Sequence, residues 1–415
     1  MTGSADRPPV RIVHLGLGAF HRAHQVAYTQ LGDPEWGIAA VQGRSARLAR
    51  TLAAQDHVYT LVERGPDTDA FHRMTALVAA YGADRAAELD RLVADPGVAV
   101  ITLTITEAGY VVDEKDVAAM RESRVPRTAP SRLLRALDAR RRSGAGPIAV
   151  VPCDNVLANG ARIRSALTVL ASEMDGDLLA WMTDHVSFVD TVSDRITPAA
   201  TPADVDLVAT AAGWPDRAPV VTEPFSEWVL AGEFPAGRPD WQRAGTTVVD
   251  DIRPFERRKL RLLNGAHLFL AMAGPARGHE TVAEAIADPE LARLTDEYWA
   301  AASPGVPDAA AYRKRLRARF ANGRIQHSLA QIAQDAEHKL RERVVPLVTE
   351  LLAAGADPGP ALRVVAAWLA HTGDAPRPDA ALDRLAPGWA ADRRLRHGLD
   401  LAALELSRLG SPSGR

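Results

Sequence analysis

Residues 10–21 read Val-Arg-Ile-Val-His-Leu-Gly-Leu-Gly-Ala-Phe-His, an apolar run that passes directly into two closely spaced glycines. The run from Val10 to Leu15 predicts a buried strand, and residues 21–31 predict a helix. Gly16 and Gly18 fit a tight turn that brings backbone N–H groups close to a pyrophosphate. Because His21 replaces the third glycine of the G-x-G-x-x-G pattern, a strand-to-helix turn without a ligand remains an alternative.

Further β-branched runs follow this turn and alternate with helical patterns. We expect strands at residues 37–41, 98–106, 147–151, 186–189, 220–222 and 246–249, with helices between them, for example at 131–142 and 162–174. This alternation predicts an α/β fold whose sheet is doubly wound and mostly parallel.

The pattern of the sequence changes near Asp250, after which the β-branched runs disappear. Apolar residues then recur at spacings of three and four, which predicts amphipathic helices. The expected helices cover residues 255–272, 281–302, 309–320, 329–352, 361–371 and 392–409. We therefore expect two domains, a sheet-containing domain over residues 1–250 and a mainly α-helical domain over residues 251–415.

The composition excludes several classes of partner. The 415 residues are 47% hydrophobic and 24% charged, and 49 basic against 52 acidic side chains give a net charge of −3. This balance argues against binding to nucleic acid or an anionic membrane. No apolar run approaches the ~18 residues of a membrane span, and the polar N-terminus does not resemble a secretory signal. Cys153 is the single cysteine, so no internal disulfide can form, and we expect a cytoplasmic protein.

The end of the second expected strand bears on the choice of cofactor. An acidic residue usually stands there and holds the adenosine ribose, but this chain reads Val41-Gln-Gly-Arg44. Arg44 could instead meet the 2′-phosphate of NADP, or it could be an ordinary solvated arginine. The pattern leaves both NAD and NADP open.

Several blocks of sequence resemble, in one consistent order, the long-chain mannitol dehydrogenase family of polyol dehydrogenases and hexuronate reductases. The matching blocks include residues 12–24, 103–110 (Leu-Thr-Ile-Thr-Glu-Ala-Gly-Tyr), 153–155 (Cys-Asp-Asn) and 259–267 (Lys-Leu-Arg-Leu-Leu-Asn-Gly-Ala-His). The resemblance implies a Rossmann-type dinucleotide-binding domain followed by a mainly helical catalytic domain, in a chain shorter than typical members.

The resemblance implies hydride transfer between a secondary alcohol and a ketone with NAD and without a metal. It makes Lys259 the general acid/base, and because a lysine pKa near ~10.4 is too high for this role, we expect burial to depress it. Asn155 and Asn264 would donate amide N–H groups to the developing alkoxide oxygen. Since these asparagines fall in different expected domains, we expect the site to draw on both.

Two further residues near Lys259 are candidates for catalytic roles. On an α-helix, Lys259, Asn264 and His267 fall within an arc of about 140° at ~100° per residue. His267 would orient substrate hydroxyls, although an isolated histidine of this kind is more often a core residue. Glu256, three residues before Lys259, would guide the proton to solvent, or it is simply an acid at a helix start.

The remaining binding residues follow from the same resemblance. Together with the glycine turn and the end of the second expected strand, it gives as cofactor-binding residues Gly16, Gly18, Phe20, His21, Arg22, Arg44, Thr106, Glu107, Asn155 and Asp194. The substrate-binding residues that it implies are Asp194, Lys259, His267, Gln331 and Lys339. Gln331 resembles the hexuronate-reductase form, but Glu337 departs from the family pattern and would repel a carboxylate substrate if it faces the pocket. A sugar alcohol and its ketose, such as mannitol and fructose, are therefore expected, with fructuronate or tagaturonate reduction as the alternative.

Two other classes of function are alternatives to a metal-independent dehydrogenase. A zinc alcohol dehydrogenase would need a ligand set that the isolated pair His21 and His24 does not supply. An inactive sugar- or nucleotide-binding protein on the same fold would have no reason to retain Lys259, Asn155 and Asn264 together. We expect a small-molecule sugar substrate and a monomer.

Overall fold

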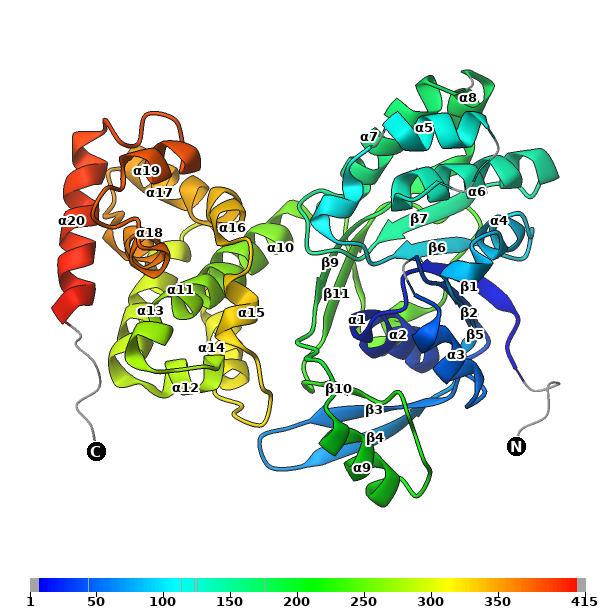
Figure 1. The fold of residues 1–415 in the computed structure, drawn as a ribbon, viewed down its shortest axis with the longest axis horizontal. Coiled ribbons are helices and arrows are strands. Elements are labelled where there is room, and N and C mark those ends of the chain that lie inside the picture. Colours follow the sequence, from blue (N-terminus) through cyan, green and yellow to red (C-terminus); the bar gives the residue numbers. More distant parts are fainter. Residues whose placement is uncertain are drawn as a thin grey trace. The chain divides into compact units, whose positions relative to one another are not determined.

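The computed structural model describes residues 7–43, 45–112, 114–122, 124, 126–174 and 176–408. The chain divides into two compact units, Met1–Ile252 and Arg253–Arg415 (Figure 1). Among the described residues, no helix is both long and apolar enough to cross a membrane.

A parallel sheet forms the centre of the first unit (Figure 1). Within the described residues it has six strands in the order β5-β2-β1-β6-β7-β8, all paired in parallel. The bounds are β1 (Val10–Leu15), β2 (Gly37–Val41), β5 (Leu77–Tyr81), β6 (Val100–Leu103), β7 (Ile148–Pro152) and β8 (Val186–Phe188). The prediction of a doubly wound, mostly parallel sheet is thus confirmed.

Both faces of this sheet are covered, which explains why its strands are almost wholly apolar. Ile12 of β1 packs into one hydrophobic cluster, whereas its neighbours Val13 and Leu15 belong to another. The helices of this unit are α1 (Ala19–Ala23), α2 (Gln25–Gly32), α3 (Arg47–Ala53), α4 (Glu88–Val93), α5 (Glu114–Arg121), α6 (Ala129–Ser143), α7 (Asn159–Ser172), α8 (Gly176–His185) and α9 (Pro202–Ala211), with short 3₁₀ turns η2 (Ala83–Arg85), η3 (Glu107–Tyr110) and η4 (Trp241–Ala244).

Two smaller sheets complete the described part of the first unit, and most of their strands were not predicted. One has the order β10-β3-β4 and the other β12-β11-β9. Their bounds are β3 (Tyr59–Arg64), β4 (Asp69–Met74), β9 (Asp190–Asp194), β10 (Val220–Thr222), β11 (Glu227–Ala231) and β12 (Thr247–Val248). Strand β4 mixes exposed and buried residues, whereas β3 is buried over its first four residues and ends in the half-buried charges of Glu63 and Arg64. Neither strand therefore shows the long apolar run that marks a central parallel strand.

The second unit is helical throughout its described elements. These are α10 (Arg253–Arg258), the π-helical segment η5 (Lys259–Asn264), α11 (Gly265–Ala273), η6 (Pro275–Arg277), α12 (Val282–Ala287), α13 (Pro289–Ala302), α14 (Ala309–Phe320), α15 (Leu329–Ala333), α16 (Ala336–Arg343), α17 (Val345–Ala353), α18 (Gly359–Thr372), α19 (Asp379–Leu385) and α20 (Arg393–Arg408). Every residue of α11 is buried, so this helix is the core around which the others pack.

The expected continuous helices at residues 281–302 and 329–352 are each interrupted. Asp288 ends the first, because its carboxylate caps the N–H groups of Glu290 and Leu291 and Pro289 opens α13. In the second, Asp335 adopts a left-handed backbone with φ of 54°, which separates α15 from α16, and Val344 separates α16 from α17. Apolar periodicity continues across these breaks, so it does not reveal them.

Candidate active site

A cavity of about 410 Å³ opens at the carboxyl ends of β1, β2 and β6, where the strand order reverses. This is the place where open parallel sheets bind ligands. Its lining residues are Leu15, Gly16, Leu17, Val41, Gln42, Gly43, Thr104, Ile105, Thr106, Gly109, Arg127, Thr128, Ala129 and Arg132. Of the predicted cofactor residues, Gly16 and Thr106 line this cavity.

The glycine turn fits a dinucleotide at two positions. Gly16 has φ of +118°, and a Cβ placed there would lie 2.8 Å from Thr104 Oγ1, so only glycine is accommodated. A Cβ placed on Gly18 would have no atom within 4 Å, so the backbone there borders open space. Gly18 also precedes α1 without a side-chain cap, which leaves the first N–H groups of that helix for another acceptor.

His21 packs beneath the turn instead of lining the cavity. Its ring stacks on His14 of β1 at 3.3 Å between centroids, and burial lowers the pKa of His21 to about 3. His14 is held by the hydroxyls of Thr102 and Thr104, at 2.8 and 3.0 Å. The histidine in the third glycine position therefore serves helix–strand packing as a neutral ring.

The next two predicted cofactor residues also make internal contacts. Phe20 stacks on His24 at 5.0 Å between ring centroids. Arg22 is buried, and its Nη1 donates to the carbonyl oxygen of Ala218 at 2.5 Å. Neither belongs to the lining of the cavity described above.

Arg132 is a cavity residue that the sequence analysis did not select. It is 7% exposed, and within the described residues its Nη2 has no hydrogen-bond partner. Its Nη1 lies 2.7 Å from the position a Cβ would take on Gly43, so this glycine makes room for the guanidinium. The helical pattern of residues 131–142 did not show which of its arginines faces the sheet edge. Arg44 lies outside the described residues, as does the side chain of Glu107.

Asp154 holds the loop that forms one wall of the cavity. Its two carboxylate oxygens accept hydrogen bonds from the backbone N–H of Ile105 at 2.5 Å and from the Tyr110 hydroxyl at 2.6 Å. Asp154, which directly precedes Asn155, thus holds the loop after β6 at both of its ends. Burial raises the pKa of Asp154 to about 7.

Asn155 follows β7 and has an exposed side chain at the carboxyl edge of the sheet. The nearby Asn159 fixes this region, because its Nδ2 donates to the carbonyl oxygens of Asp154 and Thr191 and its Oδ1 accepts from the N–H of Thr191. Asp194 ends β9 and is buried, in register with Glu227 of β11. Asp154 and Asn159 are supporting residues that were not predicted, although Asp154 lies within the matching Cys-Asp-Asn block.

In the second unit, three of the predicted catalytic residues share one continuous helical stretch. Lys259 begins η5 and Asn264 ends it, and Glu256 lies on α10 just before them. Asn264 and Glu256 are buried, whereas Lys259 is partly buried. Because η5 is π-helical, the expected α-helical arc of about 140° is wrong: a π-helix closes its bonds between residues five apart, so Lys259 and Asn264 lie close to one above the other.

His267 stands on the first turn of α11 and is 7% exposed. Its ring stacks on Phe320 at 4.3 Å and meets His327 edge-on at 4.8 Å between centroids. Burial, followed by the nearby charges of His327, Arg319, Arg343 and Lys259, places the pKa of His267 well below its ordinary value. The imidazole is therefore neutral, and its Nε2 is buried with no hydrogen-bond partner in the described part of the chain.

The predicted substrate residues Gln331 and Lys339 lie on α15 and α16. Gln331 is exposed, and Lys339 Nζ donates to the carbonyl oxygen of Ile332 at 2.9 Å. The carboxylate of Glu337 is paired with Arg341 and with Arg384, the latter at 3.0 Å. The negative charge that the sequence analysis singled out is thus compensated by two arginines.

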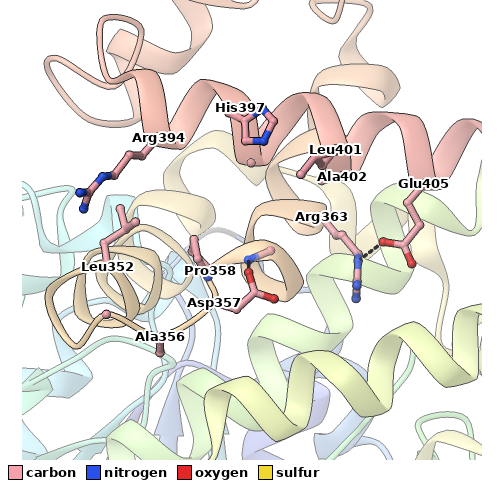
Figure 2. Close-up of a pocket in the computed structure, with 13 residues that line it drawn as sticks. Leu352, Ala356, Asp357, Pro358, Arg363, Arg394, His397, Leu401, Ala402 and Glu405 are labelled. Atoms are coloured by element: carbon pink, nitrogen blue, oxygen red, sulfur yellow. Dashed lines mark hydrogen bonds and ion pairs between the residues drawn. The ribbon is translucent and has the colours of Figure 1, made fainter.

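A second cavity, of about 440 Å³, lies against α20 in the second unit and contains none of the predicted site residues (Figure 2). Figure 2 shows Arg363 at its edge joined to Glu405, with 2.6 Å between Nε and Oε2. No group of three or more histidine, cysteine or acidic side chains able to hold a metal ion was found among the residues that the structure describes.

Comparison with known proteins covers nearly the whole chain. Residues 10–243 match the mannitol dehydrogenase Rossmann domain, and residues 251–396 match the mannitol dehydrogenase C-terminal domain. The chain is 34% identical to D-mannonate oxidoreductase of Escherichia coli (strain K12), over 93% of this chain and 84% of that protein. It is 33% identical to mannitol 2-dehydrogenase of Cereibacter sphaeroides, over 94% of this chain and 88% of that protein.

A solved structure extends the likeness to three dimensions. The Pseudomonas fluorescens mannitol 2-dehydrogenase, in a ternary complex with NAD and D-mannitol, superposes with a TM-score of 0.86 at 30% identity, covering 98% of this chain and 93% of that one. The chain belongs to the mannitol dehydrogenase family of oxidoreductases.

Proposed function

We propose that this protein interconverts a sugar alcohol and a ketose by hydride transfer with NAD(P), without a metal. Lys259 acts as the general acid/base, and Asn155 and Asn264 donate to the substrate oxygen. The observation that carries the proposal is η5, which begins at Lys259, ends at Asn264 and leads within one turn to the neutral, buried His267. Two relatives of this chain act, according to their names, on the related substrates mannonate and mannitol.

In the direction of alcohol oxidation, Lys259 Nζ takes the hydroxyl proton as negative charge grows on the substrate oxygen. The amide N–H groups of Asn155 and Asn264 stabilise that charge, and they keep this capacity at any pH because amides do not titrate. Within the described residues the Nε2 of His267 has no hydrogen-bond partner, so His267 would bond a neighbouring substrate hydroxyl, and as a neutral ring it adds no charge. Glu256 passes the proton onward to solvent. A bound nicotinamide would supply the hydride acceptor.

The residues of the first unit fit the dinucleotide. Gly18 leaves open space for a pyrophosphate, Gly16 sets the turn, and Thr106 lies in the cavity wall. Arg132 supplies a buried positive charge beside Gly43, at the end of β2 where the ribose of a dinucleotide belongs. We propose NAD as the cofactor; Arg44 keeps NADP open as well.

A second candidate is the reduction of a hexuronate such as fructuronate or tagaturonate. It is favoured by the ion pairs of Glu337. Glu337 would oppose a carboxylate substrate, but its charge is already paired with Arg341 and Arg384. Lys339, on the same helix, would be the cationic contact for a sugar acid. This reading agrees with the likeness to a D-mannonate oxidoreductase.

The deciding experiment is a substrate panel. Mannitol, arabinitol and mannonate are offered with each oxidised cofactor, and fructose, fructuronate and tagaturonate with each reduced cofactor, while nicotinamide absorbance is followed. Turnover of a neutral polyol supports the first proposal, and turnover confined to the acids selects the second. If no substrate reacts although the dinucleotide binds, the chain is a binding protein and both proposals fail.

A further inference from the structure

The π-helical geometry of η5 requires an explanation, because such segments are rare and short and are frequently found at functional sites. The segment closes its own bonds between residues five apart, as the Gly265 N–H does with the carbonyl oxygen of Leu260. Each carbonyl oxygen has two lone pairs, so it can also accept a hydrogen bond from a side chain outside the helix. In this unit such side chains come from a neighbouring helix.

Two consecutive aromatic residues of α13 donate hydrogen bonds to the backbone of η5. The Tyr298 hydroxyl donates to the carbonyl oxygen of Arg261 at 3.0 Å, and Trp299 Nε1 donates to the carbonyl oxygen of Leu262 at 2.7 Å. Both aromatic side chains are 1% exposed. Each buried polar atom thereby finds its partner in the segment that separates Lys259 from Asn264.

Gly265 shows how closely Tyr298 approaches this segment. A Cβ placed on Gly265 would lie 1.8 Å from Tyr298 Oη, so the hydroxyl occupies the space that any other residue would need. Gly265 has an ordinary helical backbone, with φ of −67°, and therefore its glycine is explained by the close approach and not by its conformation. A side chain inserted against the helical hydrogen-bond ladder is a known cause of local distortion.

The distortion changes which residues share a side of the helix. In a regular α-helix, residues five apart point about 140° away from each other at ~100° per residue. In η5 the bonds close between residues five apart, and this is the spacing of Lys259 and Asn264. A return to α-helical geometry would turn these two side chains away from each other.

We propose that Tyr298 and Trp299, together with Gly265, are positioning residues that hold η5 in its π-helical form and so set the direction of Lys259 relative to Asn264. The inference rests on the proposed function, since it treats Lys259 and Asn264 as the groups that act on the substrate oxygen. Tyr298 and Trp299 act through the backbone and touch no substrate.

The primary test is Tyr298→Phe, which removes one hydroxyl and keeps the ring. The matched control is Thr295→Val on the same helix, because Thr295 also buries a hydroxyl that donates to a carbonyl, that of Leu291 at 2.7 Å. We expect Tyr298→Phe to lower kcat about tenfold and to shift the pH dependence of kcat, with an unchanged KM for the dinucleotide. Thr295→Val should lose comparable thermal stability with a wild-type kcat and pH profile. Equal kcat values and pH profiles in the two variants would overturn the proposal.

A double variant provides a second test that does not depend on a single substitution. Gly265→Ala displaces the Tyr298 ring, so we expect it to lower kcat at least as much as Tyr298→Phe. If both act on one geometry, Gly265→Ala combined with Tyr298→Phe should be no worse than Gly265→Ala alone. Effects that multiply would show that the two residues act independently, against the proposal.

The outcomes separate this inference from the proposed function. If Lys259→Ala keeps wild-type activity, the proposed function fails whatever Tyr298→Phe does. If Lys259→Ala is inactive while Tyr298→Phe matches Thr295→Val, the proposed function stands and the positioning role is refuted.

Discussion

The two units place their candidate residues by different means. In the first, the residues follow the ends of separate strands, and the loops that carry them are fixed by hydrogen bonds that Asp154 accepts and Asn159 donates. In the second, Lys259, Asn264 and His267 lie on one continuous helical stretch whose geometry depends on a π-helical segment. The first arrangement follows from sheet topology, whereas the second depends on a local distortion of the helix.

The largest expected effect comes from the second unit. Lys259→Ala should lower kcat by about 10³-fold, since general acid/base catalysis contributes up to about that much. Lys314→Ala, at an exposed lysine of α14, is the control and should behave as wild type. Steady-state and single-turnover kinetics measure the effect. Near wild-type turnover in Lys259→Ala would remove the reason to treat the second unit as catalytic.

The paired asparagines compare the units directly. Asn155→Ala and Asn264→Ala should each lower kcat by about 10²-fold, as the loss of an oxyanion donor does. If both donate to the same oxygen, the double variant should lose less than the product of the single losses. A raised KM with unchanged kcat in either variant would assign that asparagine to binding only.

Arg132 tests whether the cavity of the first unit holds the dinucleotide. Arg132→Ala should raise the cofactor KM about tenfold, because a hydrogen bond to a charged group contributes ~1.5 kcal/mol or more. Arg135→Ala is the control on the same helix, since Arg135 is already paired with Asp90 at 2.8 Å. Measurement with both NAD and NADP tells whether the guanidinium meets a 2′-phosphate. An unchanged KM for both would place the cofactor elsewhere.

The smallest expected effect concerns Asp154 and pH. Burial raises the pKa of this carboxyl from 3.8 to about 7, so the folded chain holds the proton more tightly than the unfolded chain. Its contribution to the free energy of unfolding therefore falls as the pH rises through the window between these two values. Asp154→Asn should therefore reduce the slope of the free energy of unfolding against pH. Denaturant titrations at about pH 5 and about pH 7.5 measure this slope. An identical slope in both proteins would show that Asp154 ionises normally.

Sequence patterns predicted the first unit well where a strand is buried on both faces. The runs at Val10–Leu15 and Gly37–Val41 match β1 and β2 in their bounds, because continuous apolar residues mark a central parallel strand. Strands β3, β4, β9 and β11 of the small sheets were not predicted. Strand β4 mixes exposed and buried residues, and β9 is largely polar in sequence although most of it is buried, so neither shows a continuous apolar run. The strand-then-glycine pattern also located the cavity that Gly16 lines.

The second unit shows where sequence patterns stop being informative. Helical periodicity over residues 255–272 predicted one α-helix, and Gly265 within that stretch does not by itself reveal the π-helical segment. Its cause lies in Tyr298 and Trp299, more than thirty positions away, and in the absence of a Cβ at Gly265. Arg132 could not be predicted for a related reason. Its proposed role follows from its place beside Gly43 at the end of β2 and not from its neighbours in sequence.

The most direct test of the central claim is the pH dependence of kcat/KM for alcohol oxidation in wild type and in Lys259→Ala. We expect the wild-type value to fall toward low pH through one ionisation, because the base must be unprotonated to take the hydroxyl proton. In Lys259→Ala that limb should disappear, and the remaining slow rate should rise steadily with hydroxide concentration. A variant that keeps both the wild-type limb and most of the activity would contradict Lys259 as the group that moves the proton.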